Sequence, residues 1–412
     1  MTNTLTIPRA LEPDSAVKMT KSQHFAFFRS IESAGRDWDH GAPGNNIFLQ
    51  RPYLRILEAN PPEGMRFGYL VFYKAESPIG VALCQFKYFK GDDNIADLET
   101  TSKEPCFFGG LAKWFKRWVA GKAAADILIC GNLLLTGEHG FYFNNQHIGQ
   151  AESIGLLEKA MNHVIETMGN EGVKMPFILV KDIEPNHPAQ GQTLISKGFT
   201  EFDIQPNMVL ELPFRDMNEY LAAMSTKYRT RAKRAFKKLD GIERRKLNYT
   251  NIREELPTIY RLYRDIANNA GFNMVDLNEH YLAALQHDLS GHFQMFAYYL
   301  EGKLVAFYTT IRNHDELEAH FLGYEKALNH DYQLYLNILY DIVKVGLEGG
   351  CKRIVFARTA LEIKSSVGAV AHELPSYLRH QNSVANKFAP MILDYLKPVE
   401  AWHPRHPFKE EH

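Results

Sequence analysis

The chain has 412 residues, of which 45% are hydrophobic and 23% charged, so it is a folded protein that is too long for one core and suits two domains. Its net charge of −1 excludes a global field that would steer it to nucleic acid or anionic lipid. The scattered cysteines exclude a disulfide framework, and the lack of a signal-peptide pattern and of an apolar run of about 20 residues predicts a cytoplasmic protein.

The first half of the chain alternates between strand-like and helix-like segments after a polar arm at residues 1–21. The apolar, aromatic-rich segments 66–75 and 79–89 predict a β-hairpin. A helix is predicted at 152–169, where apolar residues recur at a helical period up to Gly169. Further strands are predicted at 126–136 and 177–183, and a helix end with two strands is predicted at 195–212.

The second half begins with a long basic helix predicted at 214–242, which ends at Asp240-Gly241. The segment 292–313 predicts a hairpin whose turn is Glu301-Gly302-Lys303. Apolar periodicity predicts the other elements, which are strands at 244–250, 317–324 and 351–359 and helices at 256–271, 278–289 and 332–350.

Both halves therefore show the same order of elements, which is helix, β-hairpin, strand, helix, strand. This order joins a largely antiparallel sheet to a βαβ unit and predicts an α/β (α+β) fold class with helices flanking each mixed sheet. In such a sheet one strand pair can splay and admit a ligand. We expect two tandem domains at 22–214 and 215–400, followed by a tail at 401–412.

Two stretches carry a more specific signal. STKYRTRAKRAFKK at 225–238 resembles the helix that opens the second domain of the Fem-type aminoacyltransferases. FARTALEIKSSVGA at 356–369 is similar to a segment of the bacterial acetyltransferase domain in polysaccharide-linked acyltransferases, with Lys364 and Gly368 at that family's Lys and Gly positions. The resemblance implies two tandem acyl-CoA N-acyltransferase (GNAT-like) domains, acyl-CoA or acyl-ACP as co-substrate, and no metal.

A GNAT domain holds the donor's pyrophosphate at a helix N-terminus, where backbone N–H groups and the helix dipole favour anions. Gln146, Gly149 and Ala151 fit the usual string before helix 152–169, as either a phosphate loop or a plain turn. The corresponding stretch of the second half has no glycine, and its candidates are Tyr332, Gln333 and Tyr335. Asp331 is expected there as a helix N-cap. Which half binds the donor stays open.

Acyl transfer to an amine needs a base, a polarised carbonyl and an acid for the thiolate. Alternation along strand 317–324 places Glu318, His320 and Tyr324 on one face, either as base and acid or as a hydrogen-bonded cluster. Arg358 and Lys364 follow the next strand, at the end where α/β sheets collect ligands. Lys364 binds a substrate anion or caps a loop.

Two helices carry further alternatives. The segment 227–238 has seven Lys or Arg in twelve residues and is either a solvated helix or an anion surface for RNA ends or lipid head groups. Few aromatics interleave these charges, so nucleic acid is not indicated unless the reaction depends on tRNA. Residues 111–119 predict an amphipathic helix, docked on the core or lying in the membrane surface, and the second alternative implies a lipid-linked amine substrate.

The leading functional hypothesis is an N-acyltransferase that uses an acyl thioester and a small-molecule or lipid-linked amine. A second hypothesis is a Fem-type aminoacyl-tRNA-dependent transferase acting on a peptidoglycan precursor. A third is a non-catalytic GNAT-like protein that binds lipids or precursors. No metalloprotease, serine-hydrolase or P-loop motif occurs in the sequence, which does not indicate the oligomeric state.

Overall fold

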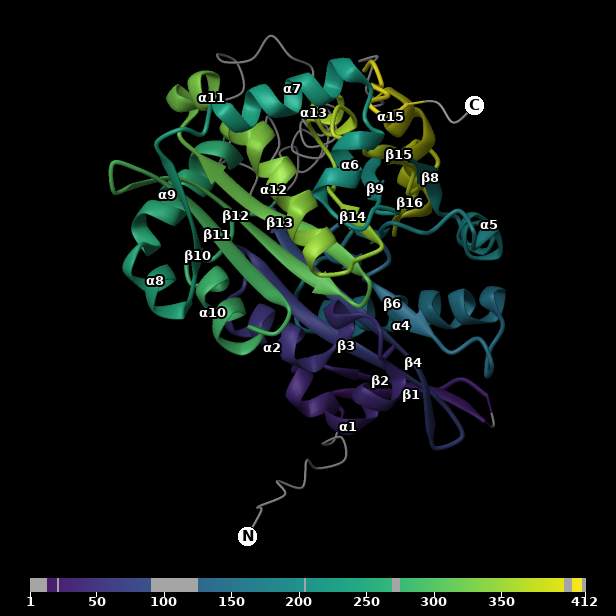
Figure 1. Ribbon diagram of the computed structural model, residues 1–412. Helices are drawn as coiled ribbons and strands as arrows, with labels where there is room; N and C mark the ends of the chain where they lie inside the picture. The colour runs from purple at the N-terminus through teal and green to yellow at the C-terminus, as the bar shows by residue number, and fades with distance from the viewer. Residues whose placement is uncertain are drawn as a thin grey trace. The chain divides into compact units, whose positions relative to one another are not determined.

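The computed structural model describes residues 13–20, 22–89, 125–203, 205–268, 275–395 and 402–409. The chain divides into two units, each built from two separate segments of sequence. The first unit comprises Met1–Ile204 with Glu373–Pro398, and the second comprises Gln205–His372 with Val399–His412. Each unit has one sheet with helices packed on it (Figure 1).

The sheet of the first unit has the order β1-β2-β3-β4-β5-β7-β16-β8, and β6 also pairs with β4. Its long central hairpin confirms the one predicted at 66–75 and 79–89. The strands are β1 (Ser15–Lys18), β2 (Gln23–Phe28), β3 (Met65–Lys74), β4 (Ser77–Phe89), β5 (Ala125–Cys130), β6 (Phe141–Phe143), β7 (Phe177–Val180), β8 (Thr200–Phe202) and β16 (Ser376–His380).

The helices of the first unit cover this sheet. The apolar face of α4, including Ile154, Leu157 and Met161, packs into the core against residues of the strands. The helices are α1 (Ile31–Gly41), α2 (Arg51–Ala59), α4 (Gln150–Asn170), α5 (Pro188–Ser196), α14 (Ser383–Asn386) and α15 (Ala389–Tyr395), with a 3-10 turn η1 (Ile47–Leu49).

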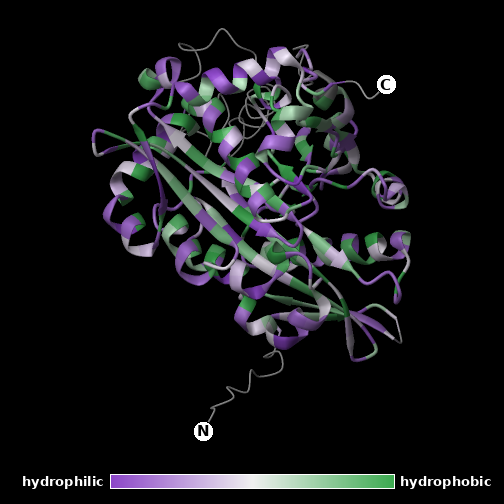
Figure 2. Ribbon diagram, viewed as in Figure 1, coloured by the Kyte–Doolittle hydropathy of each residue, from purple (hydrophilic) through white to green (hydrophobic). Residues whose placement is uncertain are grey.

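The sheet of the second unit has the order β10-β11-β12-β13-β14-β9-β15. Hydrophobic residues concentrate along the strands in Figure 2, whereas α7 carries many hydrophilic residues. The strands are β9 (Asn207–Glu211), β10 (Ile242–Leu247), β11 (Phe293–Leu300), β12 (Lys303–Asn313), β13 (Glu316–Tyr324), β14 (Arg353–Val355) and β15 (Val370–His372). The helices are α6 (Met217–Ala223), α7 (Thr226–Lys237), α8 (Tyr249–Glu254), α9 (Leu256–Ala267), α10 (Tyr281–Asp288), α11 (Lys326–Tyr332), α12 (Leu334–Glu348) and α13 (Leu361–Ser365).

The units differ from the predicted ranges because one strand of each half joins the other half's sheet. β9 lies within the predicted range 22–214 but pairs with β14 and β15 of the second sheet. β16 lies within the predicted range 215–400 but fits between β7 and β8 of the first sheet. These pairings are non-local, so the strands' own sequences hold no sign of which sheet they join.

The helix predicted at 214–242 is two helices, because the segment 402–409 returns to this place. Ser225 is the N-cap of α7, and its backbone N–H donates to the carbonyl of Pro407 at 2.9 Å. Met224 forms a β-bridge with Phe408, whose ring packs against Phe214 and Tyr220. Residues 402–409 of the predicted tail thus pack against the core of the second unit.

Candidate active site

The candidate site of the second unit is the place where β13 and β14 diverge. The two strands are parallel and pair only from Glu316 with Arg353 to Glu318 with Val355. β14 ends there, whereas β13 continues to Tyr324 and stays paired with β12 on its other side. Over residues 319–324, β13 therefore no longer pairs with β14. The two strands splay apart there, as expected for a strand pair that admits a ligand.

A β-bulge lies in the diverging part of β13. Thr310 opposes Ala319 and Tyr308 opposes Leu322, so His320 and Phe321 together face the single residue Thr309. The buried Thr309 hydroxyl accepts a hydrogen bond from the Phe321 N–H at 2.9 Å and lies 3.0 Å from the Phe321 carbonyl oxygen. This side chain bridges the irregular backbone and holds the bulge in place.

The bulge overturns the prediction that Glu318, His320 and Tyr324 share one face of the strand. Glu318 pairs with Ile311 of β12 and Tyr324 pairs with Ala306, and residues an odd number apart on β12 face opposite sides of the sheet. Tyr324 packs against Tyr335 of α12, whereas His320 contacts Tyr281 of α10. The extra residue reverses the alternation between Glu318 and Tyr324, so these three side chains do not line one surface.

His320 is held by protein groups on both ring nitrogens. Nε2 lies 3.3 Å from the Tyr281 hydroxyl, and Nδ1 lies 3.5 Å from the Thr309 hydroxyl. Burial of the ring lowers the pKa of His320 well below its ordinary value, so the imidazole is neutral at pH 7. Glu318 is buried in the same strand. The sequence patterns did not reveal Tyr281, because it lies on helix α10, far along the chain from His320 on strand β13.

The loop after β14 contains backbone strain. Ala357, Thr359 and Ala360 all have positive φ angles, of 57°, 71° and 49°, which residues other than glycine rarely adopt. Such strain concentrates at functional sites. Arg358 lies within this loop, and its Nε donates to the carbonyl of Gln205 at 2.6 Å.

The Lys364 side chain holds this loop through hydrogen bonds to its backbone. The side chain is buried, and its Nζ donates to the carbonyls of Ala357 at 3.1 Å and Arg358 at 2.6 Å. Burial lowers the pKa of Lys364 to about 7. Of the two predicted alternatives, this geometry matches the loop cap, which makes Lys364 a positioning residue for Arg358.

The second-half donor candidates lie at the junction of α11 and α12. Gln333 has left-handed backbone angles and is the N-cap of α12, a place that the sequence assigned to Asp331. The Tyr335 N–H donates to Asn329 at 2.9 Å, and the Tyr332 carbonyl accepts from Asn337 at 3.0 Å. The junction therefore closes the turn between β13 and α12 without a glycine.

The first-half donor candidates lie at the start of α4. Gly149 is its N-cap, and a side chain at this position would meet no atom within 4 Å. Gln146 and Ala151 flank it, so the string does precede a helix as predicted. However, Glu152 places a carboxylate in the first turn, where it opposes the binding of a phosphate.

In the first unit, a loop fills the place that corresponds to the diverging strands. β5 pairs in parallel with β7 up to Cys130 and Val180, and residues 131–140 then leave the sheet before β6 rejoins β4. Lys181 Nζ donates to the Leu135 carbonyl at 2.8 Å and forms a buried ion pair with Asp182. Loop and ion pair together occupy the end of the strand pair.

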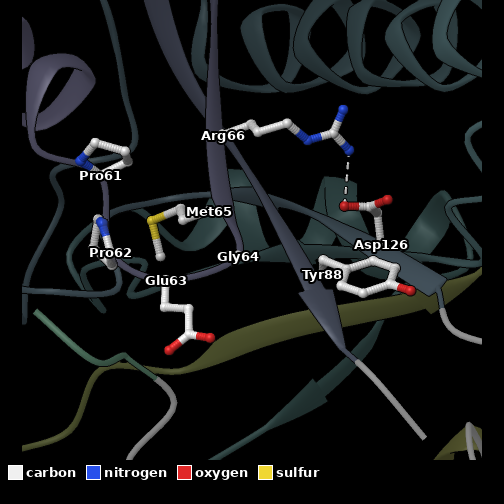
Figure 3. A pocket seen from close by; sticks show the side chains of 8 residues that line it. All are labelled: Pro61, Pro62, Glu63, Gly64, Met65, Arg66, Tyr88 and Asp126. Atoms are coloured by element: carbon white, nitrogen blue, oxygen red, sulfur yellow. Dashed lines mark hydrogen bonds and ion pairs between the residues drawn. The ribbon is translucent and has the colours of Figure 1, made fainter. Parts of the chain in front are cut away.

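A separate surface pocket of about 370 Å³ lies in the first unit (Figure 3). Arg66 and Asp126 form an ion pair at 2.9 Å beside Tyr88 within it. None of the predicted site residues lines it. The lining residues are Pro61, Pro62, Glu63, Gly64, Met65, Arg66, Tyr88 and Asp126.

The structure bears on two further expectations. Within the described ranges, no group of His, Cys, Asp and Glu could hold a metal ion. No helix of the part of the chain that the structure describes is long and apolar enough to cross a membrane. The predicted amphipathic helix at 111–119 lies outside the described residues.

Thr309→Val is expected to lower the free energy of unfolding by about 1 kcal/mol or more, because it leaves the partly buried Phe321 amide without its partner. The matched control is Thr310→Val, because Thr310 is equally buried and its hydroxyl has no hydrogen-bond partner among the described residues. That change should be neutral or slightly stabilising. Urea unfolding of both variants checks this, and equal losses would show that the bulge does not depend on Thr309.

Comparison with known proteins assigns this fold. Residues 226–365, which lie within the second unit, match the family described as Acetyltransferase (GNAT) domain. The fold is similar to the crystal structure of FemX, with a TM-score of 0.50 and 12% identity over 82% of this chain and 97% of that chain. Residues 226–365 of the second unit are therefore similar to a GNAT domain, and the chain has a two-unit fold similar to that of FemX. The predicted fold class is confirmed, and the predicted resemblance to the GNAT superfamily is confirmed over residues 226–365.

Two further similarities were found. A tandem GNAT protein from the clavulanic acid biosynthesis pathway has a TM-score of 0.43 and 9% identity, covering 84% of this chain and 91% of that chain. The protein named putative 8-amino-7-oxononanoate synthase 2 of Mycobacterium tuberculosis is 22% identical over 230 residues, which are 53% of this chain and 28% of that protein. The matching region thus spans less than a third of that relative's length.

Proposed function

We propose that the chain is an N-acyltransferase that moves an acyl group from an acyl-CoA or acyl-ACP thioester to an amine. The divergence of β13 and β14 within the matched GNAT domain is the observation that carries the proposal. An extended pantetheine arm fits the free edge of β13 as an added strand would. We assign the donor to the second unit, because the loop 131–140 fills the corresponding place in the first.

In the proposed reaction the amine nitrogen attacks the thioester carbonyl carbon and the C–S bond breaks. The attacking amine loses its proton to the neutral imidazole of His320. The Tyr281 hydroxyl, which is hydrogen-bonded to Nε2 of this ring, relays the proton from the amine to the imidazole. Glu318, on the same side of the sheet, attracts the incoming ammonium group, which releases one proton to solvent before its nitrogen attacks. A backbone N–H of β13 polarises the carbonyl, Arg358 stabilises the developing charge, and Tyr324 protonates the leaving thiolate from the other side.

The acceptor is an amine, either a small molecule or one linked to a lipid or cell-wall precursor. The fold shared with FemX favours a second candidate, which is a Fem-type transfer of an amino acid from a charged tRNA. In the first candidate reaction the acyl donor is a thioester, and in the second it is an aminoacyl ester on tRNA. The two therefore differ in whether RNA is required.

The test combines donor consumption with variants of the proposed base. Purified protein is mixed with acyl-CoA of several chain lengths and a set of amines, and thiol release is followed with a thiol-reactive dye. His320→Gln and Glu318→Gln are each expected to lower the rate by about 100-fold or more. No thiol release with any donor, together with activity that requires charged tRNA, would overturn the thioester proposal in favour of the second candidate.

A further inference from the structure

We propose that one side of α7 binds the phosphate groups of the nucleotide that carries the acyl group. This side is formed by Lys227, Arg231, Arg234 and Lys238, which we name the α7 basic stripe. The spacing of four, three and four residues places them along one line of the helix. The inference rests on the proposed function, because it takes acyl-CoA as the donor.

The packing of α7 against α12 fixes which of its sides stay accessible. Ala232 and Ala235 are buried, and the Asn337 side-chain amide of α12 donates to the Ala235 carbonyl at 2.9 Å. Phe236 packs edge-on against Tyr340 at a ring distance of 5.2 Å. The remaining surface of α7 carries the α7 basic stripe on one flank and Arg229, Lys233 and Lys237 on the other.

The α7 basic stripe faces the segment that joins β13 to α12. Lys238 Nζ donates to the carbonyl of His330 in α11 at 3.0 Å, which turns this flank toward the α11–α12 junction. Figure 1 shows α7 running along the second unit with α11 near one of its ends. A donor whose thioester lies at the free edge of β13 extends in this direction, since α11 begins directly after that strand.

Most cations of the α7 basic stripe are not neutralised by carboxylates among the described residues. In the described ranges, Arg231, Arg234 and Lys238 form no ion pair with a carboxylate. Of the neighbouring acidic residues, Asp331 is paired with His330 and Asp240 follows the end of α7. These cations therefore add a positive field where the junction has no glycine loop to bind phosphate.

One buried hydroxyl adds a directed donor beside these cations. Tyr340 is 2% exposed, and within the part of the chain that the structure describes its hydroxyl has no hydrogen-bond partner. Arg231 lies close enough to act on it electrostatically. A buried hydroxyl without a partner costs free energy, which a phosphate oxygen held by Arg231 would recover.

The geometry favours a compact nucleotide over an RNA chain. Arg231 to Lys238 span about 10 Å along the helix axis, which matches the phosphates of one nucleotide. Binding of single-stranded RNA uses exposed aromatic rings on which bases stack. Both aromatic residues of α7, Tyr228 and Phe236, pack against the core of the unit and offer no such platform.

Two charge-matched triple variants test this assignment. Arg231→Gln/Arg234→Gln/Lys238→Gln removes three charges from the α7 basic stripe, and Arg229→Gln/Lys233→Gln/Lys237→Gln removes three from the opposite flank. Titration calorimetry with CoA and with pantetheine, which lacks the nucleotide, separates the contributions. The first variant should bind CoA at least tenfold more weakly with pantetheine binding unchanged, while the second should stay within twofold of the parent protein for both ligands.

The other outcomes are decisive as well. Equal weakening in both triple variants would mean a diffuse field and overturn the inference, and so would unchanged CoA binding in the first variant. If that variant keeps CoA but loses charged tRNA, the stripe is an RNA surface instead. If the parent protein binds neither CoA nor acyl-CoA, the proposed donor itself is wrong. Circular dichroism of each variant shows that α7 remains folded.

Discussion

Lys364→Met is expected to lower the rate of acyl transfer by about two orders of magnitude while the protein stays folded. Nζ of Lys364 donates to the carbonyls of Ala357 and Arg358, and these two residues shape the strained loop at the end of β14. Without it the loop relaxes and Arg358 moves away from the reacting atoms, and misplacement by about 1 Å is enough for a loss of this size. Steady-state rates of thiol release measure the change.

The pH dependence of stability tests whether burial lowers the pKa of Lys364 in the folded chain. The pKa of Lys364 is about 7 in the folded chain against 10.5 for an ordinary lysine. Between these values the unfolded chain binds a proton that the folded chain does not, so this group makes the free energy of unfolding rise with pH. Urea unfolding at pH 7, 8 and 9 should show this rise in the parent protein and lose it in Lys364→Met.

Lys344→Met serves as the control, because Lys344 lies on α12 with half of its side chain exposed and, among the described residues, forms an ion pair with Glu348 alone. It should change neither the rate nor the pH profile. If Lys364→Met keeps the rate within threefold of the parent protein, Lys364 does not position the loop. If its pH profile stays unchanged, the lysine is already protonated in the folded chain.

Local signals in the sequence were sufficient for the hairpins. The turn between β11 and β12 has positive φ angles at Glu301 and Gly302, and the flanking strands are rich in apolar and aromatic residues, so pattern and turn chemistry agree. The order of strands and helices in each half follows from similarly local patterns. This is why the fold class was predictable before any pairing was known.

The candidate site was less predictable, because distant side chains shape it. A strict alternation of two places Glu318 and Tyr324 together, and only the hydroxyl of Thr309 on the next strand shows that a residue is inserted between them. Tyr281, which holds His320, is 39 residues away along the chain. The break between α6 and α7 likewise depends on Phe408 near the other end of the chain. Sequence periodicity holds no information about such contacts.

Gly323→Ala is expected to destabilise the second unit by about 3 kcal/mol. A Cβ atom at this position would lie 2.6 Å from the backbone carbon of Leu262 in α9 and 2.6 Å from the ring of Phe307. Backbone atoms cannot rotate away as a flexible side chain can, so α9 must shift from β13. The φ angle of Gly323 is not positive, which leaves close packing as the reason for glycine.

The same shift should also abolish acyl transfer, because Phe321 beside the bulge packs edge-on against Tyr263 of α9. Gly155→Ala in α4 is the matched control, since its Cβ would meet no atom within 4 Å and alanine favours a helix by about 0.5–1 kcal/mol. Urea unfolding and thiol release are measured for both variants. A Gly323→Ala protein as stable and active as the Gly155→Ala protein would mean that α9 does not approach β13 this closely, and the support for the bulge would then have to come from Thr309 alone.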